Sequence, residues 1–308
     1  MKTFYYPGDA LPLGSYAATI GFFDGVHRGH QYLIDQLRQA GAARGLTPMV
    51  ITFDRHPREV VQTGWQPQLL STTAEKLQLL AQTGIGVAVV LRFDAAMAGL
   101  SARRFMSEVL AAQLNVRLLL TGYDNRFGHD RTEGFDDYRR YGREVGIDVV
   151  AARALQIEGV TGSSSVVRRL LADGRVGEAA TCLGRPYTLS GVVVHGEQVG
   201  RRIGFPTANL QTDDVHKLLP ASGAYAVLAE LSGGQQLPAM TNIGTRPTFK
   251  GHRETIETHI LARVDNLYGM RLTLHFVERL RGEQAFASPE ALRQQLEEDR
   301  KKAEQLLK

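Results

Sequence analysis

Disulfide bonds, membrane spans and a secretion signal are all missing from this sequence of 308 residues. The single cysteine, Cys182, has no partner for an intramolecular disulfide, which favours a reducing compartment. No apolar run reaches the roughly 18 residues of a membrane-spanning helix. Residues 1–14 lack the basic start and apolar stretch of a secretory signal. We therefore expect a cytoplasmic protein without a membrane partner.

An excess of one charge sign is also missing. The chain has 36 Lys and Arg against 32 Asp and Glu, and the two signs are interspersed around a net charge of +4. A nucleic-acid surface normally shows as a dense basic patch or stripe. We therefore expect no nucleic-acid partner and attribute the small excess to anionic ligands. The length suffices for two hydrophobic cores.

The first part of the chain alternates strand-like and helix-like segments. Apolar runs predict strands at residues 17–20, 49–53, 87–91, 116–120 and 147–151. Helical spacing over residues 31–43, a capping box of Thr72 and Glu75, and Ser101 as an N-cap predict the helices between them. The alternation predicts an α/β domain, a Rossmann-like parallel sheet that binds ligands at the carboxyl ends of its strands.

The pattern changes near Cys182, where we place a domain boundary between residues 1–182 and 183–308. Beyond it, β-branched segments separated by turn residues predict strands at residues 188–194, 224–231, 236–243, 255–261 and 271–280. They indicate a small antiparallel β-barrel. Ser288 and Pro289 form an N-cap and first-turn pair, which predicts a closing helix that packs on the barrel.

A glycine-rich turn with two histidines lies between the strand at residues 17–20 and the helix at 31–43. Its glycines allow close backbone approach, and the helix start directs N–H groups and the positive end of its dipole at the turn. The turn therefore predicts an ATP phosphate site at Gly21, Phe22, Phe23, Asp24, Gly25 and Gly29.

His27 and His30 are three residues apart in this turn, so both imidazoles can donate to phosphate oxygens that gain charge in a transition state. Zinc binding and a purely structural turn are the alternatives. Zinc needs further ligands, and Cys182 and the scattered remaining histidines form no second cluster with ligand spacing.

A second glycine-bounded loop follows the domain boundary. Glycine hinges with adjacent arginines predict a phosphate-binding flap at Gly200, Arg201, Arg202 and Gly204. Pro206 favours an extended chain, in which Thr207 and Asn209 project oxygen atoms to one side. That arrangement suits Mg²⁺ shared with nucleotide phosphates. A Pro-bounded β-turn is the structural alternative.

Further polar residues follow predicted strands or begin a predicted helix. Asp54, Asp124 and Arg126 come after strands and reach the same sheet edge, although turn residues and helix caps also occupy such positions. A serine run at a helix start supplies hydroxyl and N–H groups for leaving phosphates, and Arg168 on that helix predicts a pyrophosphate clamp. The serines are Ser163, Ser164 and Ser165.

In their order along the chain, these motifs resemble the bacterial bifunctional riboflavin kinase and FAD synthetase (FMN adenylyltransferase) family, whose first domain belongs to the HxGH nucleotidyltransferase superfamily. The resemblance rests on residues 21–30, 52–57, 122–128, 163–168, 200–209, 242–249 and 257–259. It implies a six-stranded barrel that phosphorylates riboflavin to FMN with ATP. It also implies an α/β domain that adenylylates FMN to FAD and releases pyrophosphate.

The same resemblance implies roles for single residues. Glu257 matches the catalytic base of the kinase, with Glu254 as its nearest rival, and His27, His30 and Arg168 match catalytic groups of the adenylyltransferase. The implied flavin-binding residues are His56, Pro57, Asp124, Asn125 and Arg126. One Mg²⁺ per active site, ATP as co-substrate, and a monomer or weak homo-oligomer complete these expectations.

The chain departs from the usual family pattern at Phe23, Asn125, Ser165 and Gln198, without loss of a proposed catalytic group. Other functions stay open. The α/β domain could adenylylate another phosphate ester, or the chain could be a non-catalytic flavin-binding or nucleic-acid-binding protein with an OB-like barrel. The barrel's basic residues gather in the flap and the final helix, which favours the enzyme.

Overall fold

The computed structural model describes residues 1–122, 126–129, 132–155, 162–196, 199–248, 251–262, 264 and 266–308. The chain divides into two compact units, Met1–Gly162 and Ser163–Lys308. By this division α7 (Ser164–Ala172) and α8 (Val176–Leu183) group with the second unit. The functional boundary at 182/183 stays a prediction, because packing alone does not say which active site a helix serves.

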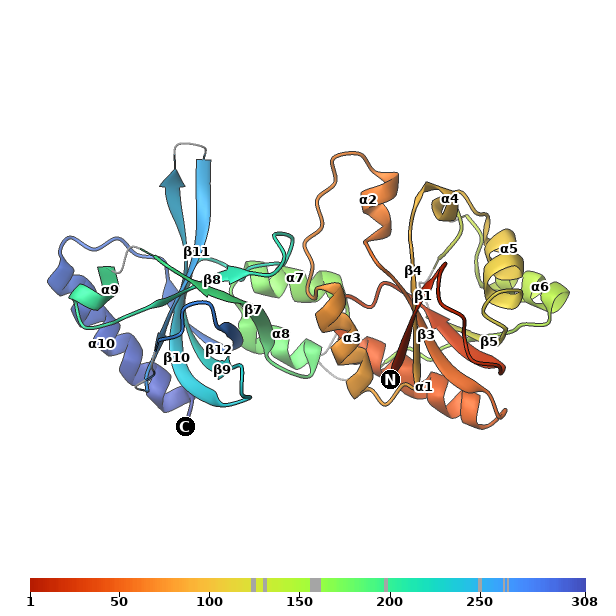
Figure 1. Ribbon diagram of the computed structural model, residues 1–308, viewed down its shortest axis with the longest axis horizontal. Helices are drawn as coiled ribbons and strands as arrows, with labels where there is room; N and C mark the ends of the chain where they lie inside the picture. Colours follow the sequence, from red (N-terminus) through yellow and green to blue (C-terminus); the bar gives the residue numbers. More distant parts are fainter. Residues whose placement is uncertain are drawn as a thin grey trace. The chain divides into compact units, whose positions relative to one another are not determined.

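The first unit contains a parallel sheet with helices on both faces (Figure 1). Within the described residues its six strands lie in the order β1-β4-β3-β2-β5-β6. Their bounds are β1 Lys2–Tyr6, β2 Tyr16–Ile20, β3 Thr47–Phe53, β4 Val87–Leu91, β5 Val116–Thr121 and β6 Asp148–Ala151. The strand order reverses between β2 and β5, and open α/β sheets bind ligands at such a point.

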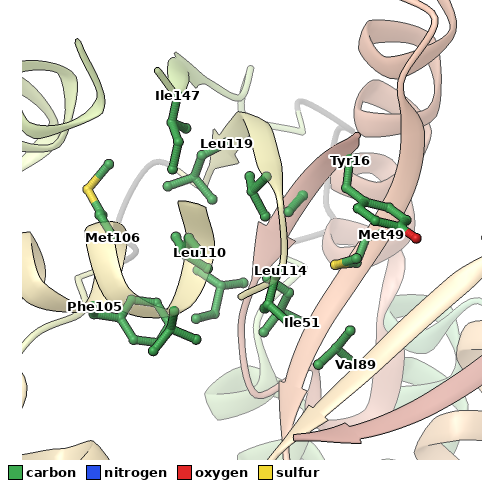
Figure 2. Close-up of a cluster of buried hydrophobic side chains, with 14 of the residues drawn as sticks. Tyr16, Met49, Ile51, Val89, Phe105, Met106, Leu110, Leu114, Leu119 and Ile147 are labelled. Carbon is green, nitrogen blue, oxygen red and sulfur yellow. The ribbon is translucent and has the colours of Figure 1, made fainter. Parts of the chain in front are cut away.

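Alternate side chains of the central strands pack on opposite faces of the sheet. Met49 of β3 lies in a cluster with Phe105 of the π-helical segment η2 (Phe105–Ala111), and Figure 2 shows both side chains. The neighbouring Val50 packs with Ile34 of α1 (Arg28–Ala42) in a second cluster. Burial of both faces explains why the central strands read as continuous apolar runs.

The remaining described helices of the first unit are η1 Asp24–Val26, α2 Pro57–Val61, α3 Thr73–Gln82, α4 Ala95–Ala98, α5 Ala102–Arg104 and α6 Phe135–Val145. The predicted capping box of α3 is confirmed, because Thr72 and Glu75 each accept a hydrogen bond from the other's backbone N–H. Ser101 caps α5 as expected, but the helix continues as the π-helical η2.

The second unit is built on a closed antiparallel barrel, as predicted. Its described strands close in the order β10-β11-β8-β7-β12-β9. Their bounds are β7 Tyr187–Val194, β8 Ala208–Thr212, β9 Gly223–Leu231, β10 Gln236–Thr248, β11 Gly251–Ile260 and β12 Arg271–Gly282. A short helix, α9 (Val199–Arg202), lies between β7 and β8.

The final helix, α10 (Pro289–Leu306), packs on the barrel and begins at the predicted N-cap, Ser288. Its Asp299 side chain is 1% exposed and accepts a hydrogen bond from Arg281 Nε of β12 at 2.9 Å. Ala303 lies in an apolar cluster with Phe205 of the flap region. A buried ion pair and an apolar contact therefore join the helix to the barrel.

Substitution of Asp299 by Ala is expected to destabilise the barrel unit by about 3–5 kcal/mol, because it leaves the guanidinium of Arg281 largely buried without its partner. Urea unfolding followed by far-UV circular dichroism measures the loss. Glu297→Ala is the matched control on the same helix, since its pair with Arg300 is exposed and worth about 0–1 kcal/mol. Equal losses of stability in the two variants would contradict the role assigned to the buried pair of Asp299 and Arg281.

Candidate active sites

The histidine-bearing turn starts directly after β2 and has an unusual backbone. Phe23 and Val26 adopt positive φ angles of 54° and 39°, and Gly25 between them has a φ of 74°. Non-glycine residues are uncommon in this region and concentrate at functional sites. Burial holds Phe23 in place, since only 2% of it is exposed. The turn is therefore a rigid cradle at the sheet edge.

His27 and His30 are brought together as predicted, and their rings stack with centroids 3.6 Å apart. His27 Nδ1 accepts a hydrogen bond from His30 N at 3.3 Å, which places the proton of the neutral His27 ring on Nε2. His30 Nδ1 is buried and has no hydrogen-bond partner among the described residues, so its proton also belongs on Nε2. The stacked rings thus each carry one Nε2–H donor.

Burial lowers the pKa of His30 well below its usual 6.5, and the charges of His27 and Lys76 lower it further. His30 is therefore neutral near pH 7 and acts on an anion as a hydrogen-bond donor rather than as a cation. The cradle gains its positive potential from the start of α1 and from nearby cations.

Asp24 of the turn is engaged inside the protein. Its carboxylate accepts hydrogen bonds from Leu70 N at 3.0 Å, Ser71 N at 2.9 Å and Ser71 Oγ at 3.1 Å. The side chain is 3% exposed. In this arrangement Asp24 fixes η1 against the segment before α3, so its contribution to a phosphate site is to position the backbone.

Gly29 of α1 meets the chain that returns from β6. A Cβ on Gly29 would lie 2.7 Å from Gly162 O, and one on Gly162 would lie 2.7 Å from Gly29 N. Only glycines allow this backbone contact. Gly162 is the last residue of the first unit and immediately precedes Ser163, the N-cap of α7.

Aromatic rings lie beside the histidine-bearing turn. The Phe22 ring meets His56 edge-on at 4.7 Å, and His56 packs on Trp65 at 4.6 Å. His56 also caps α2, with Pro57 as its first residue, and Glu59 completes the capping box. Phe22, predicted to bind phosphate, thus lies beside His56 and Pro57, predicted to bind flavin, and Trp65 is an additional neighbour.

An apolar pocket opens beside the carboxyl ends of β2 and β3, where Ile20 and Phe53 lie. It is also lined by Phe93, Met97, Ala98, Leu100, Phe105, Phe127 and Gly128. Arg126, which precedes this pocket's Phe127, is exposed. Asp124 and Asn125, the other two predicted flavin residues of this loop, lie outside the described residues.

The predicted pyrophosphate residues lie in the second unit. Ser163 is the N-cap of α7, Ser164 and Ser165 occupy its first turn, and Arg168 is half-buried on the same helix. The helix start is therefore where the sequence placed it. Its contribution to the His27 turn stays a prediction.

The barrel brings Glu257, Thr207 and Asn209 together. Thr207 Oγ1 donates to Glu257 Oε2 at 3.4 Å, and Asn209 pairs directly with Glu257 across β8 and β11. Asn242 of β10 pairs with Glu257 from the other side. Directly paired residues share a face of the sheet, so these side chains form a polar row on one wall of the barrel.

Glu254, the rival of Glu257, is exposed and pairs only with Thr245, beyond the point where β8 leaves β11. His259 Nδ1 lies 2.8 Å from Pro206 O, and since a carbonyl only accepts, Nδ1 carries the proton. His259 thus fixes the segment that presents Thr207.

The flap is held at its glycines. Phe205 N donates to Gly200 O at 2.8 Å, and a Cβ on Gly200 would collide with Phe205 O. Gly204 adopts a φ of 87°. Arg201 and Arg202 are exposed on α9. The arginines thus lie on a short helix that precedes the Thr207 segment, and their role in binding phosphate stays a prediction.

Two protein families match the chain in succession. The family model described as FAD synthetase matches residues 12–166, and the one described as riboflavin kinase matches residues 183–307. Curated proteins named bifunctional riboflavin kinase/FMN adenylyltransferase match both parts together. That of Escherichia coli (strain K12) is 40% identical over 281 residues, which cover 91% of this chain and 89% of the relative. The chain belongs to this bifunctional family.

Other members of the family support this assignment, and a solved structure supports the fold. The proteins of Pseudomonas fluorescens and Bacillus subtilis are 37% and 33% identical, each over 92% of this chain and 90% of its own length. A crystal structure described as a macrolide-efflux protein from Streptococcus pneumoniae has a TM-score of 0.88 and 30% identity, with 97% of each chain covered. The predicted resemblance and fold class are thereby confirmed.

The described part of the chain contains neither a metal-binding cluster nor a membrane-spanning helix. No group of three His, Cys, Asp or Glu side chains there is arranged to hold a metal ion. None of the helices described is both long enough and apolar enough to cross a bilayer.

Four residues of these sites were missed by the sequence analysis: Trp65, Ser71, Lys76 and Gly162. Ser71, Lys76 and Gly162 join their site through tertiary contacts with residues far away in the chain, whereas Trp65 packs on the nearby His56. The capping box at Thr72 and Glu75 predicted the helix that carries Lys76 but gave no sign of where its ammonium lies.

Proposed function

We propose that residues 183–308 phosphorylate riboflavin with ATP to give FMN and ADP, and that residues 1–182 transfer AMP from a second ATP to FMN, giving FAD and pyrophosphate. That both activities belong to the chain follows from its family membership. The assignment of residues to steps is carried by one observation. Each unit assembles its own polar site, the stacked histidines in one and the Glu257 row in the other.

In the kinase step Glu257 is the general base. It accepts the proton of the terminal ribityl hydroxyl as that oxygen attacks the γ-phosphorus, and ADP leaves. The hydrogen bond from Thr207 orients the carboxylate. Arg201 and Arg202 bind phosphate oxygens from the flap, which Gly200 and Gly204 allow to close.

Magnesium fits the oxygen donors of the Glu257 row. The Thr207 hydroxyl and the Asn209 amide oxygen are hard ligands, and they are too few to bind the ion without the nucleotide's phosphates. When bound, Mg²⁺ offsets the negative charge of the triphosphate. We propose one Mg²⁺ in each active site, with ATP as the co-substrate of both reactions.

In the adenylyl step the FMN phosphate is already an ionised nucleophile, so the site needs no base. An FMN phosphate oxygen attacks the α-phosphorus of ATP, and pyrophosphate leaves. The Nε2–H groups of His27 and His30 donate to α-phosphate oxygens, whose charge grows in the transition state. Arg168 and the N–H groups after Ser163 hold the leaving pyrophosphate.

The apolar pocket lined by Ile20, Phe53 and Phe127 supports flavin binding in the first unit. An isoalloxazine ring is flat and largely apolar, and it would bury its faces among these side chains. The phosphate turn begins one residue after Ile20, so a flavin there would direct its phosphate towards the histidines. His56, Pro57, Asp124, Asn125 and Arg126 complete this part of the proposal.

We place the enzyme in the cytoplasm, as a monomer or weak homo-oligomer that acts on riboflavin, FMN and ATP without nucleic-acid or membrane partners. The single cysteine, Cys182, is buried, as expected for a protein that needs no disulfide. The near balance of charges argues against a nucleic-acid surface.

A time course with riboflavin, ATP and magnesium tests this function. FMN is expected to appear first and FAD afterwards, with ADP and pyrophosphate formed in equal amounts once all FMN has been converted. Reverse-phase chromatography separates the flavins, and an enzyme-coupled assay counts pyrophosphate. FAD without an FMN intermediate, or FMN that never proceeds to FAD, would contradict the assignment of two reactions in sequence.

A further inference from the structure

Lys76 of α3 occupies an unusual place for a lysine. Only 1% of the residue is exposed. Its Nζ donates to Phe53 O at 2.9 Å and lies 4.2 Å from the centre of the Phe22 ring. Phe53 ends β3, and Phe22 follows the end of β2. The ammonium therefore lies at the carboxyl edge of the sheet, behind the phosphate-binding turn.

The Lys76 ammonium lies near two carboxylates, and its relation to them decides how its charge is stabilised. Among the described residues, no carboxylate forms an ion pair with Lys76. The carboxylates of Asp24 and Asp54 are nearby, but they accept hydrogen bonds from the backbone N–H groups of Leu70 and Phe93. Burying an ammonium group without an ion-pair partner lowers the stability of the fold. An apolar side chain of similar shape would usually avoid this loss. A function that needs the charge explains its presence.

The charges around Lys76 come from several elements. Asp24 of η1 and Asp54 after β3 raise its pKa, whereas burial, the larger effect, lowers it to about 8. His30 of α1 lies close enough for the charge of Lys76 to lower its pKa, His27 stacks on His30, and the His56 ring contacts Phe22. On α3 itself Glu75 is used by the N-terminal cap. Near pH 7 Lys76 therefore stays mostly protonated, whereas His30 stays neutral.

We propose that Lys76 is a positioning residue for adenylyl transfer. It ties the ends of β2 and β3 together through Phe22 and Phe53, and it holds a fixed positive charge behind the turn that binds the triphosphate. This inference rests on the proposed adenylyltransferase function of the first unit. Lys76 acts by holding the turn in place. In addition, the electric field of its ammonium group attracts the polyphosphate and keeps His30 a neutral hydrogen-bond donor.

The test compares wild type, Lys76→Met and Lys76→Arg. Initial rates of FAD formation from supplied FMN give kcat/KM for ATP between about pH 6 and about pH 9.5. Riboflavin phosphorylation by the same chain counts the active protein in each sample. Gln78→Met is the matched control, because Gln78 is an exposed residue of the same helix.

Lys76→Met is expected to lower kcat/KM for ATP at pH 7 by about 10-fold or more, since one unit charge near a polyphosphate is lost. The free energy of unfolding of Lys76→Met in urea should equal or exceed that of wild type. Removal of a lysine with a purely structural role would lower it. Wild-type kcat/KM should fall as the pH passes about 8. Lys76→Arg should keep the charge and lose this alkaline fall.

A second readout follows the histidine. In Lys76→Met the pKa of His30, measured by NMR of its ring, should rise, because one of the charges that lower it is gone. The proposal is overturned if Lys76→Met keeps the wild-type kcat/KM, or if the pH profiles of wild type and Lys76→Arg coincide. Should Lys76→Met fail to fold, the Lys76→Arg profile decides alone. A wild type that forms no FAD from FMN would instead refute the proposed function itself.

Discussion

Replacement of Glu257 by Gln is expected to lower FMN formation from riboflavin by about 10²- to 10⁴-fold, the usual contribution of a general base. Gln has the shape of Glu, and its amide oxygen can still accept the hydrogen bond from Thr207. The loss would therefore come from the missing proton acceptor and not from a collapsed site. FAD formation from supplied FMN should continue at the wild-type rate, because the histidine turn is untouched.

Glu254→Gln is the matched control, since it makes the same chemical change on the same strand. Glu254 is exposed and pairs with Thr245, away from Thr207 and Asn209. Both activities should stay within about 2-fold of wild type, as for surface substitutions in general. Separate assays from riboflavin and from FMN measure the two reactions. Loss of both activities in Glu257→Gln would contradict the division of labour, and equal losses in the two variants would remove the special role of Glu257.

The sequence predicted those parts of the fold in which burial leaves a periodic signal. The central strands β2, β3, β4 and β5 are apolar on both faces and were found, as were all described barrel strands except β8, which the sequence had not marked as a strand. β1 was missed because its position at the sheet edge leaves it partly exposed and without an apolar run. The π-helical geometry of η2 was missed because Phe105, Val109 and Leu110 also fit ordinary helical spacing.

Site residues were predictable where neighbours in the chain are also neighbours in space. His27 and His30 stack because they are three residues apart at a helix start. Asp24 shows the opposite case. A sequence pattern suggested a phosphate ligand, yet its carboxylate is bound by Leu70, which is 46 residues away. Such contacts depend on how the α3 segment packs against η1, and local spacing carries no information about that.

The kinase site lies between these cases. The alternation of Thr207 and Asn209 predicted that both oxygens face one way in an extended chain. Asn209 lies in β8, and Thr207 directly precedes that strand. The spacing of Thr207 and Asn209 alone does not show which strand pairs with β8. The register of β8 against β11 decides that Asn209 faces Glu257 and not Glu254, and only the family motif had favoured Glu257 beforehand.

The second large effect is expected for Gly29→Ala, which should lower FAD formation from FMN by about 10²-fold. The new methyl would lie 2.7 Å from Gly162 O and 3.1 Å from ring atoms of His27. Either the chain before Ser163 or the His27 ring must shift, and a displacement of about 1 Å at a transfer site costs about that factor. Initial rates with supplied FMN measure the effect, and riboflavin phosphorylation should be unchanged.

Stability separates this effect from a folding defect. Gly29 lies in α1 at a negative φ, so alanine suits its backbone and favours the helix by about 1 kcal/mol. Part of that gain offsets the clash, and the free energy of unfolding should change little while adenylyl transfer falls.

Gly86→Ala is the matched control, because a Cβ there meets no described atom within 4 Å. Gly162→Ala should reproduce the loss, since it closes the same gap from the opposite side. Wild-type FAD formation in both Gly29→Ala and Gly162→Ala would show that the two backbones can part without disturbing His27, and the contact would then have no part in catalysis.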